Sequence, residues 1–372
     1  MTYRSSFLKL LASVCLTALA LQAPLHAQEP AAMPQAQTQA QVQAMTQAMV
    51  AQEARAAALM QRDDVVGTGV GMDENGDPVI KVFARHRWFG AMPQQMDGFP
   101  VEVEVTGTVY ALDQLAEPAA PEAPEAEDFG DGTLEGEDAG SAEALMANPR
   151  GRFGRPVPIG VSISNTGSCG AGTLGARVSD GRDVFILSNN HVIALSNAAG
   201  LNSRIVQPGR LEVDCRTITR DTVARLTSFV RIDFSGRSNL IDAAIARTST
   251  GQVGTATPSD GYGRPQSRTL AARLGQRVQK YGRTTGFTRG RVTALNVTIN
   301  VDYGGGRVAR FVRQIAIEGD RVNFSDRGDS GSLIVEQGSN RPVGLLFAGG
   351  GVSTFANRID DVLDRFGVSI DE

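Results

Sequence analysis

The stretch that decides most about this chain lies near its C-terminal end and reads Gly328-Asp329-Ser330-Gly331-Ser332. A polar, turn-prone segment precedes it, and the apolar run Leu333-Ile334-Val335 follows, which predicts a buried strand. A serine on a glycine-flanked turn at the start of a strand is exposed, and backbone N–H groups lie beside its hydroxyl. Acyl transfer needs this arrangement, because donors must bind the developing oxyanion next to the nucleophile. Ser330 is therefore a candidate nucleophile, although glycine, aspartate and serine also build ordinary turns.

A serine hydroxyl needs a base, and the chain has three histidines. His26 falls in a segment that predicts a removed leader, which leaves His86 and His191. His191 ends a strand pattern in polar residues, so its imidazole is expected at a strand-to-loop junction; a structural histidine that caps a turn is the alternative. Asp242 heads a small apolar strand, where a buried carboxylate needs a partner such as an imidazole N–H. Asp233 competes for that role, but its surroundings predict a loop.

Chain order sharpens this hypothesis. His191, Asp242 and Ser330 follow one another at separations of 51 and 88 residues. This is the chymotrypsin order and differs from the subtilisin and α/β-hydrolase orders. Together with the stretches 278–286 and 342–350, these residues make the C-terminal three-fifths of the chain resemble chymotrypsin-fold serine proteases. The resemblance is closest to secreted bacterial members such as the streptogrisins.

The resemblance implies an all-β fold of two six-stranded β-barrels with the active site between them. The i, i+3, i+4, i+7 spacing of Ile359, Val362, Leu363 and Phe366 predicts an amphipathic C-terminal helix that packs on the second barrel. The resemblance also implies that Ser330 attacks a peptide carbonyl, that His191 serves as base and then acid, and that Asp242 holds the imidazole tautomer. The N–H groups of Gly328 and Ser330 would form the oxyanion hole. It places the substrate pocket at Phe324, Asp326, Phe347, Ala348 and Gly349. Medium or small apolar side chains are the expected preference, and basic ones if Asp326 points inward.

The sequence also departs from the family pattern. Asn189-Asn190 stands before the histidine where the family more often has two alanines, and Ser332 stands where it more often has a glycine. The activation sequence of animal proteases is absent from the chain, so Asp329 is not expected to pair with a new N-terminus. By analogy with the bacterial branch, Lys280 or Arg283 is the expected partner.

The N-terminus predicts export. Residues 1–27 combine the positive Arg4 and Lys9, an apolar core and a small residue before the expected cut, as a signal peptide does. We therefore expect a secreted or periplasmic bacterial protein. No other segment of the sequence is apolar enough to cross a bilayer. Two cysteines then remain, and one disulfide between Cys169 and Cys215 is the simplest arrangement; two buried free thiols are the alternative.

Composition divides the remaining chain into four parts. These are a Gln/Ala-rich segment at 28–62, a small α/β or β-rich module at 63–112, an acidic Pro/Ala/Glu-rich linker at 113–155, and the trypsin-like domain at 156–372. A hairpin is expected around 73–78 in the module, because turn residues there separate two strand patterns. The module resembles a propeptide, and an interaction domain is the alternative. Residues 28–149 are expected to be self-contained and to assist or restrain the protease domain, with a cut at Arg150, Arg152 or Arg155.

Charge is divided unevenly between the two halves. Residues 1–149 carry a net charge of −14 and residues 150–372 a net charge of +10. The basic residues form no run, so contact between the halves, or simple solubility, is favoured over a specific nucleic-acid partner. With so few His and Cys no metal or other cofactor is expected. The expected partners are peptide or protein substrates and the chain's own N-terminal region; a catalytically weak module that binds peptides or anionic surfaces is the alternative function.

Overall fold

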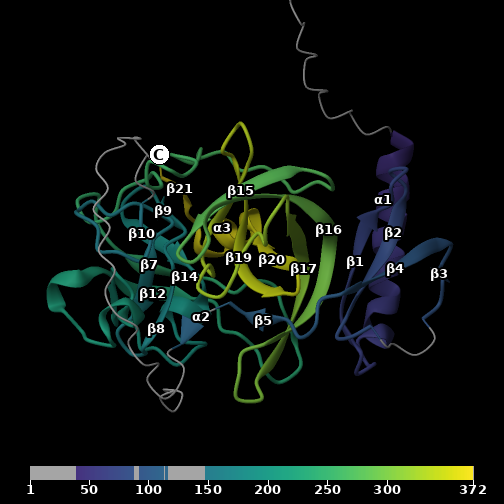
Figure 1. Cartoon of the computed structure of the whole chain (residues 1–372), viewed down its shortest axis with the longest axis horizontal. Helices are drawn as coiled ribbons and strands as arrows, with labels where there is room; N and C mark the ends of the chain where they lie inside the picture. Colours follow the sequence, from purple (N-terminus) through teal and green to yellow (C-terminus); the bar gives the residue numbers. More distant parts are fainter. Residues whose placement is uncertain (1–38, 88–91, 113, 116–146, 372) are drawn as a thin grey trace, which may run out of the picture. The chain divides into compact units, whose positions relative to one another are not determined.

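The computed structural model describes residues 39–87, 92–112, 114–115 and 147–371. The expected signal peptide and most of the expected linker lie outside these residues. The fold is all-β, with two curled sheets, as the sequence predicted (Figure 1). Within the described part of the chain, no helix is both long and apolar enough to span a membrane.

The first barrel is a closed ladder in the order β9-β10-β14-β12-β11-β7-β8. Only Leu174 and Gly175 separate β8 from β9. Strands β8 and β9 therefore form one bent strand, and the barrel has six strands. Hydrogen bonds from Gly160 N–H to the Leu174 carbonyl and from Gly175 N–H to the Leu187 carbonyl continue the ladder across the bend. Its elements are β7 (Ser162–Asn165), β8 (Gly170–Thr173), β9 (Ala176–Ser179), β10 (Val184–Ser188), α2 (Asn190–Ile193), β11 (Arg204–Val206), η1 (Arg210–Val213), η2 (Thr219–Asp221), β12 (Thr222–Phe229) and β14 (Ala244–Arg247).

The second barrel follows the order β17-β20-β19-β18-β15-β16, and β16 pairs back with β17 to close it. Its strands are β15 (Arg277–Gly282), β16 (Gly286–Asp302), β17 (Val308–Gly319), β18 (Leu333–Glu336), β19 (Pro342–Gly350) and β20 (Ser353–Arg358). Short strands extend the sheets: β13 (Ser238–Asn239) pairs with β17, and β21 (Ser369–Ile370) pairs with β9. The two barrels therefore each show the six-stranded closure that the resemblance implied.

The N-terminal module contains α1 (Gln39–Leu59), β1 (Val65–Met72), β2 (Pro78–Ala84), β3 (Gln95–Met96) and β4 (Phe99–Val105). The predicted hairpin is present, because β1 and β2 pair antiparallel, and β4 pairs parallel with β2 (Figure 1). On its other edge β1 pairs with β16, so one sheet runs from the module into the second barrel. The backbones approach closely there: a Cβ added to Gly67 would lie 2.8 Å from the Thr298 carbonyl oxygen. The module is thus not self-contained, contrary to expectation.

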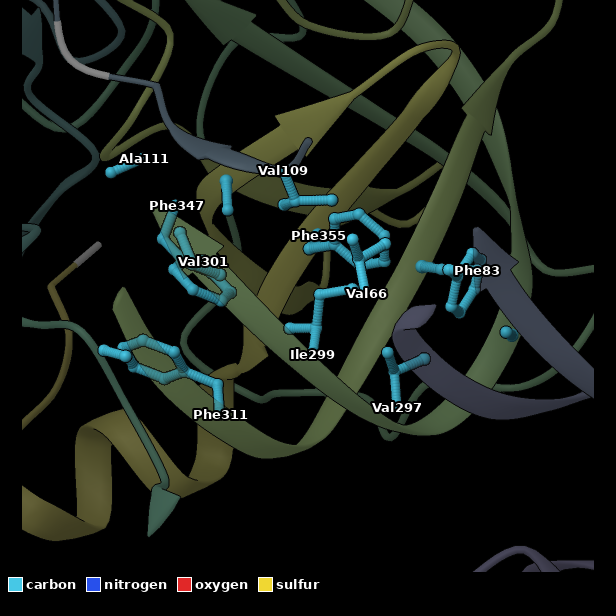
Figure 2. Packing of buried hydrophobic residues seen from close by; sticks show 14 of the residues in the cluster. Val66, Phe83, Val109, Ala111, Val297, Ile299, Val301, Phe311, Phe347 and Phe355 are labelled. Carbon is cyan, nitrogen blue, oxygen red and sulfur yellow. The ribbon is translucent and has the colours of Figure 1, made fainter. Parts of the chain in front are cut away.

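A shared apolar core joins the module to the second barrel. Figure 2 shows Val66 and Phe83 of the module beside Ile299 and Phe355 of the barrel. The Phe83 and Phe355 rings meet edge to face with centroids 5.3 Å apart, a favoured geometry for aromatic pairs. Burial of these side chains removes apolar area from water on both partners at once, so the interface stabilises both.

The predicted C-terminal helix is α3 (Ile359–Phe366). Its buried residues Ile359, Val362 and Leu363 pack into a cluster that contains Leu345 of the second barrel and Phe185 of the first. The helix packs on the second barrel as expected, and it also contacts residues of the first barrel.

Candidate active site

His191 and Asp242 lie together where two paired strands end. His191 stands on the short turn α2 that follows β10, and Asp242 stands just before β14, which pairs with β10. His191 Nδ1 lies 2.5 Å from Asp242 Oδ2, and the His191 backbone N–H donates to Asp242 Oδ1 at 3.2 Å. Both side chains are entirely buried. The structure therefore brings Asp242 to the histidine, whereas Asp233 binds Ser235 within its own loop.

Amide side chains hold this pair in place. Asn189 Nδ2 donates to the Asp242 carbonyl at 2.7 Å, and Asn190 Nδ2 donates to the Val230 carbonyl at 2.6 Å. The Asp242 N–H in turn donates to Asn357 Oδ1 at 3.0 Å. The two asparagines that depart from the family pattern are thus structural links between β10 and the loops around Asp242.

Tyr303 is a site residue that the sequence did not reveal. Its hydroxyl donates to Asp242 Oδ2 at 2.8 Å, and its ring meets the His191 ring edge to face with centroids 5.8 Å apart. Tyr303 lies in the turn between β16 and β17, 61 residues from Asp242, and no local motif marks it. Asp242 Oδ2 therefore accepts from both the imidazole and the phenol, which orients the carboxylate.

Ser330 lies on a tight turn between the barrels and is entirely buried, although its sequence context predicted an exposed position. Its Oγ donates to the Phe347 carbonyl at 3.1 Å, and its own carbonyl accepts from the Thr173 N–H of β8 at 2.8 Å. Gly331 has φ +95°, and a Cβ there would lie 2.3 Å from the Thr173 carbonyl oxygen, so only glycine fits. Ser188, at the end of the strand that carries His191, donates from Oγ to the same Thr173 carbonyl. The serine turn is therefore bound to the strand ends that hold the histidine.

Asp329 forms a buried ion pair beneath this turn. Its Oδ2 lies 3.5 Å from Lys280 Nζ, and both side chains are entirely buried. Thr285 Oγ donates to the same carboxylate at 2.7 Å. Burial lowers the pKa of Lys280, and the Asp329 charge opposes that shift. Of the two expected partners, Lys280 therefore pairs with Asp329, and Arg283 instead binds Glu212 at 2.6 Å.

A segment of the chain itself lies against the serine turn. Strand β5 (Tyr110–Ala111) pairs antiparallel with β19, with Ala111 opposite Ala348 and Tyr110 opposite Gly349. The Leu112 N–H donates to the Phe347 carbonyl at 3.2 Å. The Leu112 carbonyl accepts from the Gly328 N–H at 2.7 Å. The Leu112 carbonyl thus binds the Gly328 N–H, which is one of the two backbone donors expected to bind an oxyanion.

Four of the five expected pocket residues lie beside the bound segment or in the apolar cluster around Leu112, and Asp326 does not. Phe324 is buried in the same apolar cluster as Leu112, and a Cβ on Gly349 would lie 2.9 Å from Leu112 Cδ1. Ala348 pairs with the bound segment through its backbone. The Phe347 side chain turns into the core with Phe311, and its carbonyl meets the segment (Figure 2). Asp326 is exposed, and its carboxylate caps the Arg327 N–H.

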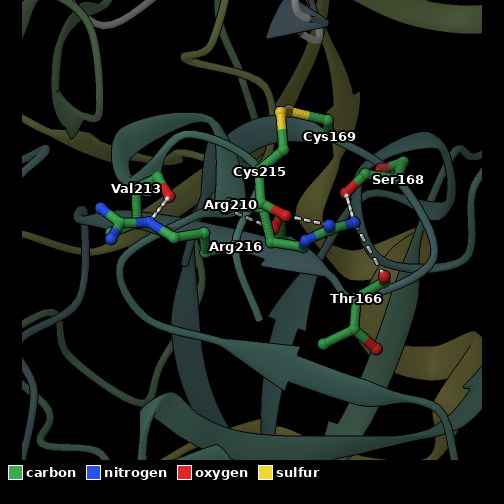
Figure 3. The surroundings of a disulfide bond; sticks show 8 residues. Thr166, Ser168, Cys169, Arg210, Val213, Cys215 and Arg216 are labelled. Atoms are coloured by element: carbon green, nitrogen blue, oxygen red, sulfur yellow. Dashed lines mark hydrogen bonds between the residues drawn. A yellow bond between two sulfur atoms is a disulfide. The ribbon is translucent and has the colours of Figure 1, made fainter. Parts of the chain in front are cut away.

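The disulfide between Cys169 and Cys215 is confirmed, and it lies just before β8 (Figure 3). The Arg210 guanidinium donates to the carbonyls of Thr166 and Ser168, each at 3.0 Å, and to that of Cys215. This arginine therefore ties the two cysteine-bearing segments together beside the covalent bond. Among the described residues, no group of three or more His, Cys, Asp or Glu side chains is arranged to hold a metal ion.

Comparison with known proteins supports the resemblance. Residues 228–358 match the family model described as the Nal1 C-terminal domain. The chain is 38% identical over 80 residues to serine protease 2 of Streptomyces fradiae, which is 22% of this chain and 40% of that protein. A match of this extent leaves more than half of the relative's length uncovered.

Solved structures of bacterial serine proteases are also similar. A glutamic-acid-specific serine protease is 21% identical with a TM-score of 0.42, over 58% of this chain and 100% of the other. The chymotrypsin of Cellulomonas bogoriensis is 20% identical with a TM-score of 0.39, over 58% and 98%. Protease A of Thermobifida fusca is 16% identical with a TM-score of 0.40, over 57% and 97%. The sequence match to serine protease 2 and the two closed six-stranded barrels bear out the predicted resemblance to chymotrypsin-fold bacterial serine proteases.

Proposed function

We propose that the chain is a secreted or periplasmic serine endopeptidase that works through an acyl-enzyme intermediate. The observation that carries this proposal is the buried His191–Asp242 pair, with 2.5 Å between Nδ1 and Oδ2, on strand ends to which the Ser330 turn is bonded. The disulfide supports an oxidising compartment. No other buried histidine–carboxylate pair is present among the described residues.

Each residue has a role that follows from its atoms. Ser330 Oγ attacks the carbonyl carbon while His191 Nε2 takes the hydroxyl proton, since Nδ1 is held by Asp242. The Asp242 carboxylate keeps the proton on Nδ1 and stabilises the imidazolium. The N–H groups of Gly328 and Ser330 bind the oxygen as it becomes negative. Water then hydrolyses the acyl-enzyme with the same base.

Covalent labelling tests the proposal. Because Leu112 lies against the serine turn, the variant Leu112→Asp gives the accessible form, since a carboxylate disfavours the apolar site. A fluorophosphonate should label Ser330 in this variant, and mass spectrometry locates the label. Adding Ser330→Ala or His191→Ala should abolish labelling and hydrolysis of a denatured protein mixture while the circular dichroism spectrum is retained. Unchanged hydrolysis after Ser330→Ala would rule out the mechanism.

A peptide-binding module without catalysis is the second candidate. The observation that favours it is that the serine turn holds an extended segment by backbone hydrogen bonds. In that case Leu112→Asp would bind added peptide, yet it would neither react with the fluorophosphonate nor release products.

A further inference from the structure

We propose that the ion pair between Glu212 and Arg283 sets the orientation of the Arg327–Gly328 peptide group through the Thr284 hydroxyl. Glu212, Arg283 and Thr284 are thus positioning residues, which keep the Gly328 N–H aimed at the place where an oxyanion forms. The inference rests on the proposed function, because this N–H matters for a reaction that passes through an oxyanion.

The ion pair joins the two barrels. Glu212 stands on η1 of the first barrel, and Arg283 directly follows β15 of the second. Arg283 Nε lies 2.6 Å from Glu212 Oε1, and the Arg283 and Glu212 side chains are 2% and 11% exposed. Ser162 Oγ, at the start of β7, donates to the same carboxylate oxygen at 2.9 Å. Because little water reaches the pair, the guanidinium depends on the carboxylate for its charge-assisted hydrogen bond and takes its direction from it.

The element that carries Glu212 is itself well anchored. Figure 3 shows Arg210 of η1 beside the disulfide between Cys169 and Cys215. Arg210 donates to two carbonyls of the segment before Cys169 and to the Cys215 carbonyl. The Glu212 carboxylate is therefore a rigid partner, and Arg283 is held by a part of the first barrel that does not move easily.

From Arg283 the contacts lead to the oxyanion donor. Arg283 Nη1 donates to Thr284 Oγ1 at 3.1 Å, and Thr284 Oγ1 donates to the Arg327 carbonyl at 2.6 Å. The Arg327 carbonyl and the Gly328 N–H belong to one planar trans peptide group, so they point in opposite directions. A hydroxyl that holds the carbonyl on one side therefore fixes the direction of the N–H on the other.

This peptide group would turn easily without an outside contact. Gly328 has φ +99°, and glycine has broad access to such conformations, so its own backbone resists rotation only weakly. A Cβ on Gly328 would lie 2.7 Å from Arg283 Nη1, which shows how closely the guanidinium approaches the turn. Rotation would aim the Arg327 carbonyl at the oxyanion and remove a donor. The orientation of one peptide group therefore decides whether the oxyanion is stabilised.

Thr173 holds the next peptide group along the turn. Its Oγ1 donates to the Gly328 carbonyl at 2.9 Å, and its backbone N–H donates to the Ser330 carbonyl at 2.8 Å. Thr173 Oγ1 also accepts the Arg283 backbone N–H at 3.0 Å. Arg283 thus acts on both sides of Gly328, through Thr284 on the peptide group before it and through Thr173 on the one after it.

Four variants of the exported chain, each in the accessible Leu112→Asp background, test the inference. Glu212→Gln removes the negative charge of the pair, and Thr284→Val removes the hydroxyl while the ion pair stays. Thr284→Ser keeps the hydroxyl and is the matched control for Thr284→Val. Asp371→Asn is the matched control for Glu212→Gln, because it breaks an ion pair of similar length, 2.7 Å to Arg177 Nε, that does not involve the serine turn.

Turnover and the binding of a tetrahedral analogue give the readout. The substrate is a chromogenic peptide anilide with leucine before the scissile bond, and the analogue is the peptide boronic acid with leucine at the same place. Glu212→Gln and Thr284→Val should each lower kcat at least about tenfold and keep KM within about twofold, because the N–H acts on the oxyanion rather than on bound substrate. Affinity for the boronic acid should fall by the same factor. Thr284→Ser and Asp371→Asn should keep kcat within about threefold of the background.

Other roles of the pair predict other results. If the pair only stabilises the fold, Glu212→Gln lowers the free energy of unfolding in urea and leaves kcat per folded molecule unchanged, which overturns the inference. Equal kcat in Thr284→Val and Thr284→Ser also overturns it, because the hydroxyl is then not the link. If Arg283 acts by its charge alone, Glu212→Gln speeds turnover, since the cation stays beside the turn without its counter-charge, and the inference fails again.

Failure of the proposed function is distinguishable from failure of the inference. A Leu112→Asp background that folds yet neither reacts with a fluorophosphonate nor cuts the anilide removes the proposed function. Hydrogen exchange of the segment 326–331, measured by mass spectrometry with Leu112 restored, then decides whether the contacts hold the peptide group. Exchange should be faster in Glu212→Gln and Thr284→Val than in their controls, and equal exchange rules out the positioning. If Glu212→Gln does not fold, Thr284→Val against Thr284→Ser still decides.

Discussion

In the first barrel, His191 and Asp242 are held by neutral amide side chains, and His191 lies inside a loop closed by a disulfide. In the second barrel, by contrast, Ser330 stands on a turn anchored by a buried ion pair. The amides of Asn189 and Asn357 hydrogen-bond without bringing charge into the core. Lys280 and Asp329 each lose their hydration, and their mutual attraction and hydrogen bonds must offset that loss.

Because the two barrels hold their site residues by different interactions, we expect substitutions to affect them differently. Neutral hydrogen bonds contribute modestly one by one, so the first barrel is expected to lose function before it loses its fold. For a buried ion pair, removing both charges lowers the stability of the fold less than removing one charge, because a single remaining charge is buried without a partner. The second barrel is therefore expected to lose its fold when a single partner is removed.

Replacing Asp242 by Asn should give the largest effect. The amide keeps the shape but favours the wrong imidazole tautomer, which in comparable triads lowers turnover about 10⁴-fold. Tyr303→Phe is the matched control, because it removes one hydrogen bond to the same carboxylate, and it should lower turnover roughly tenfold. Steady-state kinetics in the Leu112→Asp background checks both. Equal losses would mean that the charge of Asp242 contributes no more to turnover than its hydrogen bond from Tyr303.

Lys280→Met should destabilise the second barrel by roughly 3–5 kcal/mol, since it leaves the Asp329 charge buried without its cation. Urea unfolding gives the free energy of unfolding. The double variant Lys280→Met with Asp329→Asn should lose less, because no charge then remains in the core. If the double variant has a lower free energy of unfolding than the single variant, then Thr285 and the backbone N–H groups, and not Lys280, are what stabilise the Asp329 carboxylate.

Removing the disulfide by Cys169→Ser with Cys215→Ser should cost about 4 kcal/mol, because the bond joins residues 46 positions apart in the chain. Activity per folded molecule should change little, since the Arg210 contacts remain to tie the two segments together. Thermal unfolding with and without reductant measures the first effect, and labelling of Ser330 measures the second. Full thiol labelling of the wild type without reductant would contradict the bond.

Glu318→Gln should give the smallest effect, at the boundary of the second barrel and the module. Burial first, and then the Glu104 carboxylate, raise the pKa of Glu318. The folded state therefore holds this proton more tightly, and stability falls as pH rises from 4.5 through the raised pKa. Because solvent screens this half-buried group, Glu318→Gln should raise the free energy of unfolding at pH 7 by less than about 1 kcal/mol. Melting temperatures should differ at pH 7 and coincide at pH 4; a difference at both would exclude titration as the cause.

Much of the fold and site could be predicted because the signals are local. The apolar run after Ser332, the turn at 73–78 and the spacing of Ile359, Val362 and Leu363 each report a backbone period over a few residues. The order of His191, Asp242 and Ser330 in the chain led to the family resemblance, and the resemblance predicted the fold. The choice of Asp242 over Asp233 followed from burial, because the apolar flanks of Asp242 required a partner.

Other parts could not be predicted because their contacts join distant segments. Tyr303 reaches Asp242 only through the long β16–β17 hairpin, and the turn around it looks like any other. The pairing of β1 with β16 depends on glycines that allow close backbone approach. In a sequence, glycines within a strand pattern can equally indicate a bulge or a bend. A self-contained module was therefore expected where the structure has a shared sheet.

The side-chain chemistry was visible in the sequence: a serine on a glycine-flanked turn, a histidine with a carboxylate expected to be buried, two cysteines for a bond, and strands that alternate with turns. These are properties of side chains and of short backbone periods, so they are readable without coordinates. Which part of the chain lies against the serine turn became known only from the folded structure. A two-residue strand such as Tyr110–Ala111 has no period of its own, and its place is set by an unpaired strand edge, an apolar site of leucine size and the N–H of Gly328, which only folding brings together.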